Sequence, residues 1–171
     1  MTPETFLQRK LRWVTLGGQY DWTAKSYPSE KPPDFPADIK ALLEGIFPDT
    51  KAEAAICNFY SPGDRLSLHR DVAEECARPL TSISIGCEAV FFCGIVDEAG
   101  RCKTLAIRLR SGDAVVMSGA SRFAWHGVPL VLKGTCPEAL ASFPAADGEY
   151  EQWRGWMAGK RVNLNVRQMV E

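Results

Sequence analysis

The chain of 171 residues has only two histidines, His69 and His126, and no excess of charge of either sign, since 20 lysine and arginine residues are matched by 21 aspartate and glutamate residues. Without a basic field over the whole molecule, binding of a polyanion would need a local patch of positive charge. No apolar run approaches the roughly 20 residues of a membrane-spanning helix. Residues 1–5 show no signal peptide, so we expect an intracellular protein, nuclear or cytoplasmic, or mitochondrial if a targeting segment has been trimmed.

The sequence also lacks any Cys-x-x-Cys pair, although it contains six cysteines. They are Cys57, Cys76, Cys87, Cys93, Cys102 and Cys136. Several of them lie in apolar runs typical of strands, which favours buried, reduced thiols over a disulfide framework or a zinc site. An apolar fraction of 46% and a charged fraction of 24% are those of an ordinary soluble protein, and the length is enough for one domain with its own core.

One amphipathic helix is predicted in the first third of the chain. Apolar side chains recur at helical spacing from Ile39 to Phe47, Asp34 is a candidate N-cap, Pro36 lies in the first turn and Pro48 ends the pattern. A strand around residues 11–16 precedes this helix.

From residue 52 onward, short apolar runs alternate with turn signals. The predicted strands lie at 53–60, 65–71, 80–86, 89–93, 103–110, 113–118, 124–132 and 160–168. Because helices do not alternate with these strands, we predict a mainly β protein with flanking helices, built as a jelly-roll sandwich and not as a parallel sheet. Residues 133–159 are predicted to be an insertion, whose second half, 149–157, forms a short helix.

A candidate metal site lies in the segment 56–71, which is predicted to form two strands joined by a turn at Pro62-Gly63. The second strand ends in His69-Arg70-Asp71. Residues i and i+2 of a strand point to the same face, so His69 and Asp71 can hold one ion. With His126 they make the two-histidine, one-carboxylate set of non-haem iron(II) sites. The His-x-Asp pair alone is a weak signal, and its weight depends on the rest of the chain.

A candidate anion receptor lies near the C-terminus, where polar and apolar side chains alternate. One face of the predicted strand carries Arg161, Asn163, Asn165 and Arg167, and the other carries Val162, Leu164 and Val166. A solvent-exposed polar face is one interpretation. Inside a barrel, the same face would bind an anion, because arginine pairs with carboxylates through two parallel hydrogen bonds.

Taken in order, these motifs resemble the AlkB family of Fe(II)- and 2-oxoglutarate-dependent dioxygenases. The resemblance rests on Asn58-x-Tyr60, His69-x-Asp71, His126 and Arg161-x-Asn163-x-x-x-Arg167, and it extends from about Leu11 to Gln168. The opening Leu-Arg-Trp-Val-Thr and the Met-Ser-Gly run are most similar to a eukaryotic branch whose members act on N6-methyladenine in DNA and on methylated tRNA.

The resemblance implies a double-stranded β-helix core at residues 52–171, preceded by a nucleotide-recognition lid and its supporting helix at residues 1–51. It implies that His69, Asp71 and His126 hold Fe(II), and that Arg161 pairs with the distal carboxylate of the cosubstrate 2-oxoglutarate. The remaining contacts to the cosubstrate would come from Asn58, Tyr60, Asn163 and Arg167. Asn165 stands where the family usually has threonine, which is a mild departure.

The implied reaction is oxidative demethylation of an N-methylated base in nucleic acid, with consumption of O2 and 2-oxoglutarate and release of formaldehyde, succinate and CO2. The base would be N6-methyladenine in DNA, or N1-methyladenine or N3-methylcytosine in DNA or RNA. Hydroxylation or demethylation of a protein or a small molecule is the alternative with the same chemistry. A module that binds modified nucleic acid without turnover is disfavoured by the complete ligand set, and we expect a monomer.

On the substrate side, three aromatic residues precede the core where relatives carry their lid: Trp13, Tyr20 and Trp22. They would stack on a flipped base or, alternatively, pack the lid onto the sandwich. Bacterial relatives have an acidic residue where this chain has Ala73 and a basic one near Ile95, so base specificity does not carry over. The candidate phosphate contacts are Lys25, Lys31, Arg122, Lys133, Arg154 and Lys160, each of which would also serve as an ordinary surface charge.

Overall fold

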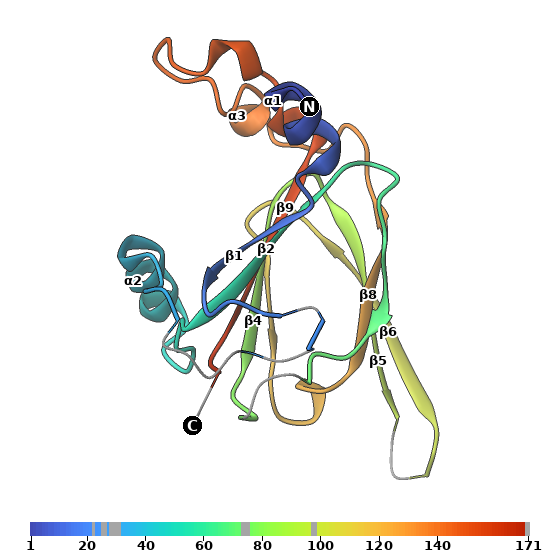
Figure 1. Ribbon diagram of the computed structural model, residues 1–171. Coiled ribbons are helices and arrows are strands. Elements are labelled where there is room, and N and C mark those ends of the chain that lie inside the picture. The colour runs from blue at the N-terminus through green and yellow to red at the C-terminus, as the bar shows by residue number, and fades with distance from the viewer. Residues whose placement is uncertain (22, 25–26, 28–31, 73–75, 97–98, 170–171) are drawn as a thin grey trace.

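The computed structural model describes all residues except 22, 25–26, 28–31, 73–75, 97–98 and 170–171. Two antiparallel sheets face each other, and their strand orders are β1-β2-β9-β4-β7 and β3-β8-β5-β6 (Figure 1). The strands are β1 (Trp13–Gly17), β2 (Ala54–Tyr60), β3 (Leu66–His69), β4 (Leu80–Gly86), β5 (Ala89–Val96), β6 (Cys102–Leu109), β7 (Ala114–Met117), β8 (Trp125–Val131) and β9 (Arg161–Arg167). This arrangement confirms the predicted jelly roll.

The helical elements are short, apart from one. They are α1 (Pro3–Thr5), the π-helical turn η1 (Phe6–Lys10), α2 (Ala37–Ile46), η2 (Gly119–Ser121), α3 (Glu138–Ala141), η3 (Glu151–Trp153) and η4 (Met157–Gly159). Among the described residues, no helix is long and apolar enough to cross a membrane.

Two predicted helix features are wrong. Asp34 does not cap α2, which begins at Ala37 with Pro36 at the N-cap position. The reason is that Phe35 precedes a proline, which disfavours helical backbone at that residue. The helix predicted at 149–157 is divided into η3 and η4, because Gly155 between them adopts a left-handed conformation with a φ of 84°.

The two faces of the five-stranded sheet pack differently. On its outer face, Leu43 of α2 packs with Ala55 and Val166, all of them almost fully buried. On its inner face, a second cluster joins the two sheets and includes Leu80 and Phe91. Strand β9 lies in the middle of this sheet. Its apolar side chains pack against α2 on the outer face, and its polar side chains point between the two sheets.

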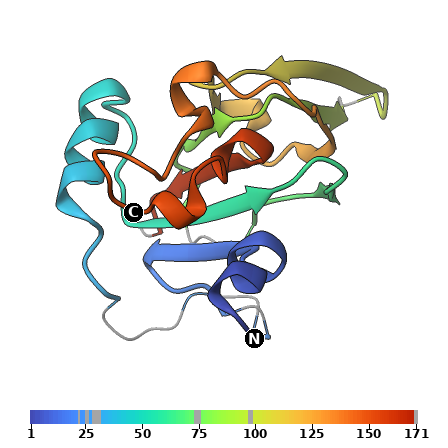
Figure 2. The same cartoon turned by 90° about the horizontal axis from the view of Figure 1, so that it is seen from above.

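The N-terminal segment packs against the insertion at residues 133–159, at the end of the barrel where β9 begins (Figures 1 and 2). Trp156 donates its indole N–H to the carbonyl of Leu7 at 3.1 Å. The Lys160 ammonium donates to the carbonyl of Gln8 at 3.0 Å and to the Ser61 hydroxyl at 2.7 Å. Lys160 is therefore buried and connects distant segments of the chain by hydrogen bonds. Its predicted role as a phosphate contact is wrong.

Candidate metal centre and active-site cavity

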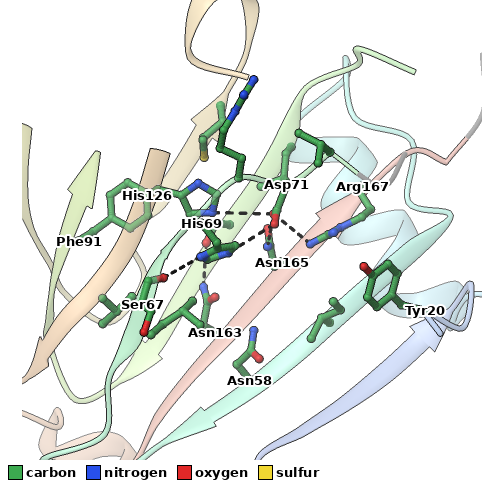
Figure 3. A pocket seen from close by; sticks show the side chains of 18 of the residues that line it. Tyr20, Asn58, Ser67, His69, Asp71, Phe91, His126, Asn163, Asn165 and Arg167 are labelled. Carbon is green, nitrogen blue, oxygen red and sulfur yellow. Dashed lines mark hydrogen bonds and ion pairs between the residues drawn. The ribbon is translucent and has the colours of Figure 1, made fainter. Parts of the chain in front are cut away.

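A cavity of about 680 Å³ opens between the two sheets, within the range of small-molecule sites. Eight of the residues to which the family resemblance assigns a role line it: Tyr20, Asn58, His69, Asp71, His126, Arg161, Asn163 and Arg167. Figure 3 shows seven of them, from Tyr20 at one side to His126 at the other. The motifs that are far apart in the sequence therefore share one cavity.

The three predicted metal ligands meet at one point. His69 and His126 are opposite each other across the β3–β8 pair, with ring centroids 4.3 Å apart. Asp71 lies two residues past the end of β3, so the predicted strand 65–71 is too long at this end. Its Oδ1 is 3.4 Å from Nε2 of His69 and its Oδ2 is 3.9 Å from Nε2 of His126 (Figure 3). Ligand atoms of all three residues lie within 4.8 Å of one another.

Both histidines are oriented for metal binding by the backbone. Nδ1 of His69 is 2.9 Å from the carbonyl oxygen of Ser67, and Nδ1 of His126 is 3.0 Å from that of Ala124. A carbonyl oxygen only accepts hydrogen bonds, so each Nδ1 carries a proton, which leaves the Nε2 of each ring to bind a metal ion or, when it is protonated as well, to donate to Asp71. This is the arrangement that second-shell partners impose on metal-binding histidines.

The carboxylate of Asp71 is held in its ionised form. Burial opposes ionisation, but the hydrogen bond with His69 and the charge of Arg167 hold the pKa of Asp71 well below its usual range. Asn165 donates to Oδ2 at 3.2 Å, and Arg167 donates to the same atom at 3.4 Å. The pKa of His69 is raised, mainly by its hydrogen bond with Asp71, whereas burial lowers the pKa of His126. The donor set is thus one carboxylate and two imidazoles, which fits Fe(II).

Arg122 has a role that the sequence did not indicate. Its side chain is almost fully buried, with 2% exposed. Nε donates to the carbonyl of Arg78 at 2.7 Å, and Nη1 donates to the carbonyl of Asp71 at 2.9 Å. The guanidinium therefore fixes the backbone of one metal ligand to the segment that carries His126, and Arg122 is not a phosphate contact. Its only signal in the sequence is its place shortly after the Met-Ser-Gly run at residues 117–119, which is similar to the eukaryotic branch of the family.

The polar face of β9 points into the cavity, which excludes the alternative of a solvent-exposed face. Arg161 is 1% exposed, its Nη2 donates to the Ser84 hydroxyl at 2.9 Å, and its guanidinium carbon lies 5.3 Å from the centre of the Tyr60 ring. Within the described part of the chain, Nε and Nη1 of Arg161 have no hydrogen-bond partner. Burial lowers the pKa of this arginine. A buried cation without a counter-ion is costly, so the site suits the carboxylate of a bound anion.

The neighbouring residues complete this end of the cavity. Asn163 donates to the Ser82 hydroxyl at 2.8 Å and to the carbonyl of Ile83 at 3.0 Å. Asn58 lies opposite Asn163 in the β2–β9 pair and lines the cavity. Tyr60 lies opposite Arg161 and is 7% exposed, and burial raises the pKa of its hydroxyl. Its ring supports the guanidinium of Arg161.

Of the aromatic residues predicted to meet substrate, only Tyr20 can be placed at the cavity, where its ring meets that of Tyr27 edge-on at 5.4 Å. Trp13 is 43% exposed and lies opposite Asn58 in the β1–β2 pair. Trp22 lies outside the described residues, as do Lys25 and Lys31. Two other candidate phosphate contacts are exposed, Lys133 and Arg154, and the latter pairs with Glu151 at 2.5 Å.

The jelly roll, the two-histidine, one-carboxylate cluster and the buried arginine facing it across one cavity define an Fe(II)- and 2-oxoglutarate-dependent oxygenase. The family model of the 2OG-Fe(II) oxygenase superfamily matches residues 1–167. The chain belongs to this superfamily and, within it, to the AlkB family.

Three curated relatives illustrate this membership. The N6-methyladenosine RNA demethylase ALKBH of Cryphonectria parasitica is 54% identical over 95% of this chain and 77% of its own length. The tRNA demethylase abh1 of Schizosaccharomyces pombe is 45% identical over 99% of this chain and 56% of its own length. The nucleic acid dioxygenase ALKBH1 of Homo sapiens is 35% identical over 98% of this chain and 48% of its own length. The chain thus spans about half the length of the last two.

A solved structure, OsALKBH1, has the same fold. It superposes with a TM-score of 0.70 at 24% identity and covers 91% of this chain and 77% of its own.

Proposed function

We propose that this chain removes methyl groups oxidatively from N-methylated bases of RNA or DNA, using Fe(II), O2 and 2-oxoglutarate and releasing formaldehyde, succinate and CO2. The observation that supports this proposal most strongly is the set of polar groups that line the cavity. At one end it presents the Nε2 atoms of His69 and His126 with the carboxylate of Asp71, and at the other the guanidinium of Arg161, whose Nε and Nη1 have no partner among the described residues. The relatives named for RNA, tRNA and nucleic-acid chemistry support the substrate class.

In this proposal, His69, Asp71 and His126 hold Fe(II), which together with 2-oxoglutarate supplies the oxidising power that breaks a C–H bond of the methyl group. The protein orients the ligands through the Nδ1 hydrogen bonds of the histidines and keeps Asp71 anionic through Asn165 and Arg167.

Arg161 would bind the distal carboxylate of 2-oxoglutarate through Nε and Nη1, with the ring of Tyr60 beneath it. Asn58, Asn163 and Arg167 would line the remaining length of the cosubstrate. Because Arg161 and Asn163 are buried, this end of the cavity excludes water from the bound carboxylate, which strengthens the ion pair.

The N-terminal residues 1–51 would act as the lid, with residues 52–171 as the catalytic core. Tyr20 brings an aromatic ring from this segment to the cavity. A base extruded from the stack into the cavity would find a stacking surface there, as enzymes that act on single bases require. Trp13 and Trp22 stay predicted substrate contacts.

The test is a panel of methylated DNA and RNA oligonucleotides incubated with Fe(II), ascorbate and 2-oxoglutarate, read by mass spectrometry. Loss of 14 mass units from the oligonucleotide, about one methylene, should accompany formaldehyde and succinate, and both should disappear in His126→Ala. The alternative, a protein or small-molecule substrate, is supported if the protein binds Fe(II) and 2-oxoglutarate normally but demethylates no oligonucleotide of the panel.

A further inference from the structure

A second, smaller cavity of about 310 Å³ adjoins the first, and Arg70 lines both. Its walls come from the end of β5 and from the segment that leads into β8, and they include Gly94, Val96, Phe123 and Trp125. We call this cavity the side groove. It touches the segment of the metal ligands without containing any of them, and the proposed chemistry does not use it.

Three apolar side chains of the side groove are partly exposed. Trp125 is 49% exposed, Phe123 is 38% exposed and Val96 is 57% exposed. Gly94 lies directly opposite Trp125 in the β5–β8 pair. A Cβ atom at Gly94 would meet its nearest neighbour, Cγ2 of Thr104, at 3.7 Å, an ordinary contact. Packing therefore does not require glycine here, and its lack of a side chain leaves the strand surface beside the indole open.

Arg70 places a positive charge on the boundary between the two cavities. It lies between the ligands His69 and Asp71 in the sequence, and its side chain is exposed. Nε donates to the carbonyl of Phe123 at 2.7 Å, which fixes the guanidinium against the side groove. Among the described residues, the guanidinium of Arg70 has no further partner, so its terminal N–H groups are available to an anion.

We propose that the side groove binds the nucleotide next to the methylated one in a single-stranded segment, with its base on Trp125 and Phe123 and the connecting phosphate on Arg70. This inference rests on the proposed function. It follows from continuity, because a base held in the main cavity is followed by a phosphate and then by the next base, and the protein offers a cation and then two aromatic rings in the same order. Aromatic faces and an arginine are the groups with which single strands are bound without base preference.

The first experiment varies substrate length. The probes are a methylated mononucleotide and single-stranded oligonucleotides of three and seven nucleotides with the same methylated base. In the wild type, kcat/KM should rise from one to three nucleotides. Trp125→Ala should lower kcat/KM for the seven-nucleotide probe about tenfold and flatten this rise. Trp125→Phe keeps a ring face and should restore most of it. Leu130→Ala, at a position on the same strand that is 46% exposed, is the matched control.

The second experiment varies salt and measures binding of the seven-nucleotide probe by fluorescence anisotropy. One phosphate contact on a single strand contributes a slope of about 0.7 to the fall of log affinity with log salt. Arg70→Ala should reduce the slope by about this amount. Lys40→Ala, which removes an exposed cation of α2 on the outer face of the five-stranded sheet, should leave it unchanged.

Because Trp125 precedes the ligand His126, Fe(II) affinity is measured in each variant, and Phe123→Ala provides the length test at a position that is not adjacent to a ligand. The inference is overturned if Phe123→Ala and Arg70→Ala demethylate with the length dependence and salt slope of the wild type. That result leaves the proposed function intact. If the wild type itself demethylates no oligonucleotide, the proposed function fails and the inference fails with it.

Discussion

The two ends of the active-site cavity are built in opposite ways. The deep end lies on β2 and β9, two inner strands of the five-stranded sheet, and its guanidinium at Arg161 is 1% exposed. The rim lies on strand ends and loops, and Val72, next to the ligand Asp71, is 60% exposed. Strand β3, which carries His69, is a four-residue strand at the edge of its sheet.

This difference separates the chemistry from the choice of substrate. The deep end holds the groups that would bind 2-oxoglutarate, the cosubstrate common to the superfamily. A regular sheet fixes the spacing of these groups. The rim carries the metal ligand His69 on a short edge strand, and its other groups, on loops, would meet the substrate; loops can change without disturbing the sheet. Variants at the two ends should therefore affect different kinetic constants.

The largest expected effect is at the deep end. Arg161→Ala should raise the KM for 2-oxoglutarate about a hundredfold, because truncation of one partner of a buried charge pair costs about 2–5 kcal/mol. The Kd for oligonucleotide should stay within about twofold in the same variant, and Lys40→Ala, at an exposed cation of α2, should change neither constant. An unchanged KM for 2-oxoglutarate would contradict the assignment of cosubstrate binding to the deep end.

An intermediate effect is expected at Arg122, which holds the backbone of the metal ligand Asp71 in place. Arg122→Lys should lower Fe(II) affinity about tenfold to a hundredfold, since lysine cannot reproduce the fork of hydrogen bonds to the carbonyls of Arg78 and Asp71. Fe(II) titration of the folded variant measures this, with Arg154→Lys as the control. A fall in thermal stability with normal Fe(II) affinity would instead assign Arg122 to folding alone.

The smallest effect is expected at the rim. Tyr20→Ala should raise the KM for a methylated oligonucleotide about tenfold, the typical worth of one stacked base, with no change in the KM for 2-oxoglutarate. Tyr150→Ala, at a tyrosine that is 53% exposed in the insertion, is the matched control. Equal effects of the two tyrosine variants would remove Tyr20 from the substrate site.

Most of the deep end could be predicted from the sequence, because its information is local. The alternation from Arg161 to Arg167 predicts which side chains share a face. At the rim, the two-residue spacing of His69 and Asp71 is equally local. Lys160 and Arg122 could not be interpreted in the same way. Their partners lie far along the chain, and Lys160 reaches a carbonyl 152 residues away. A positive charge in the sequence does not state whether tertiary contacts will bury it. The side groove was missed for a related reason, since it combines strand ends with a loop.

The buried guanidinium of Arg161 should also make the stability of the fold depend on the anion that it binds. Without its anion, the fold carries an uncompensated charge in its interior, and we expect replacement by methionine to stabilise the ligand-free protein. A ligand present at a hundred times its Kd adds about 2.7 kcal/mol to the stability of a fold that binds it. Saturating 2-oxoglutarate should thus stabilise the folded protein against unfolding.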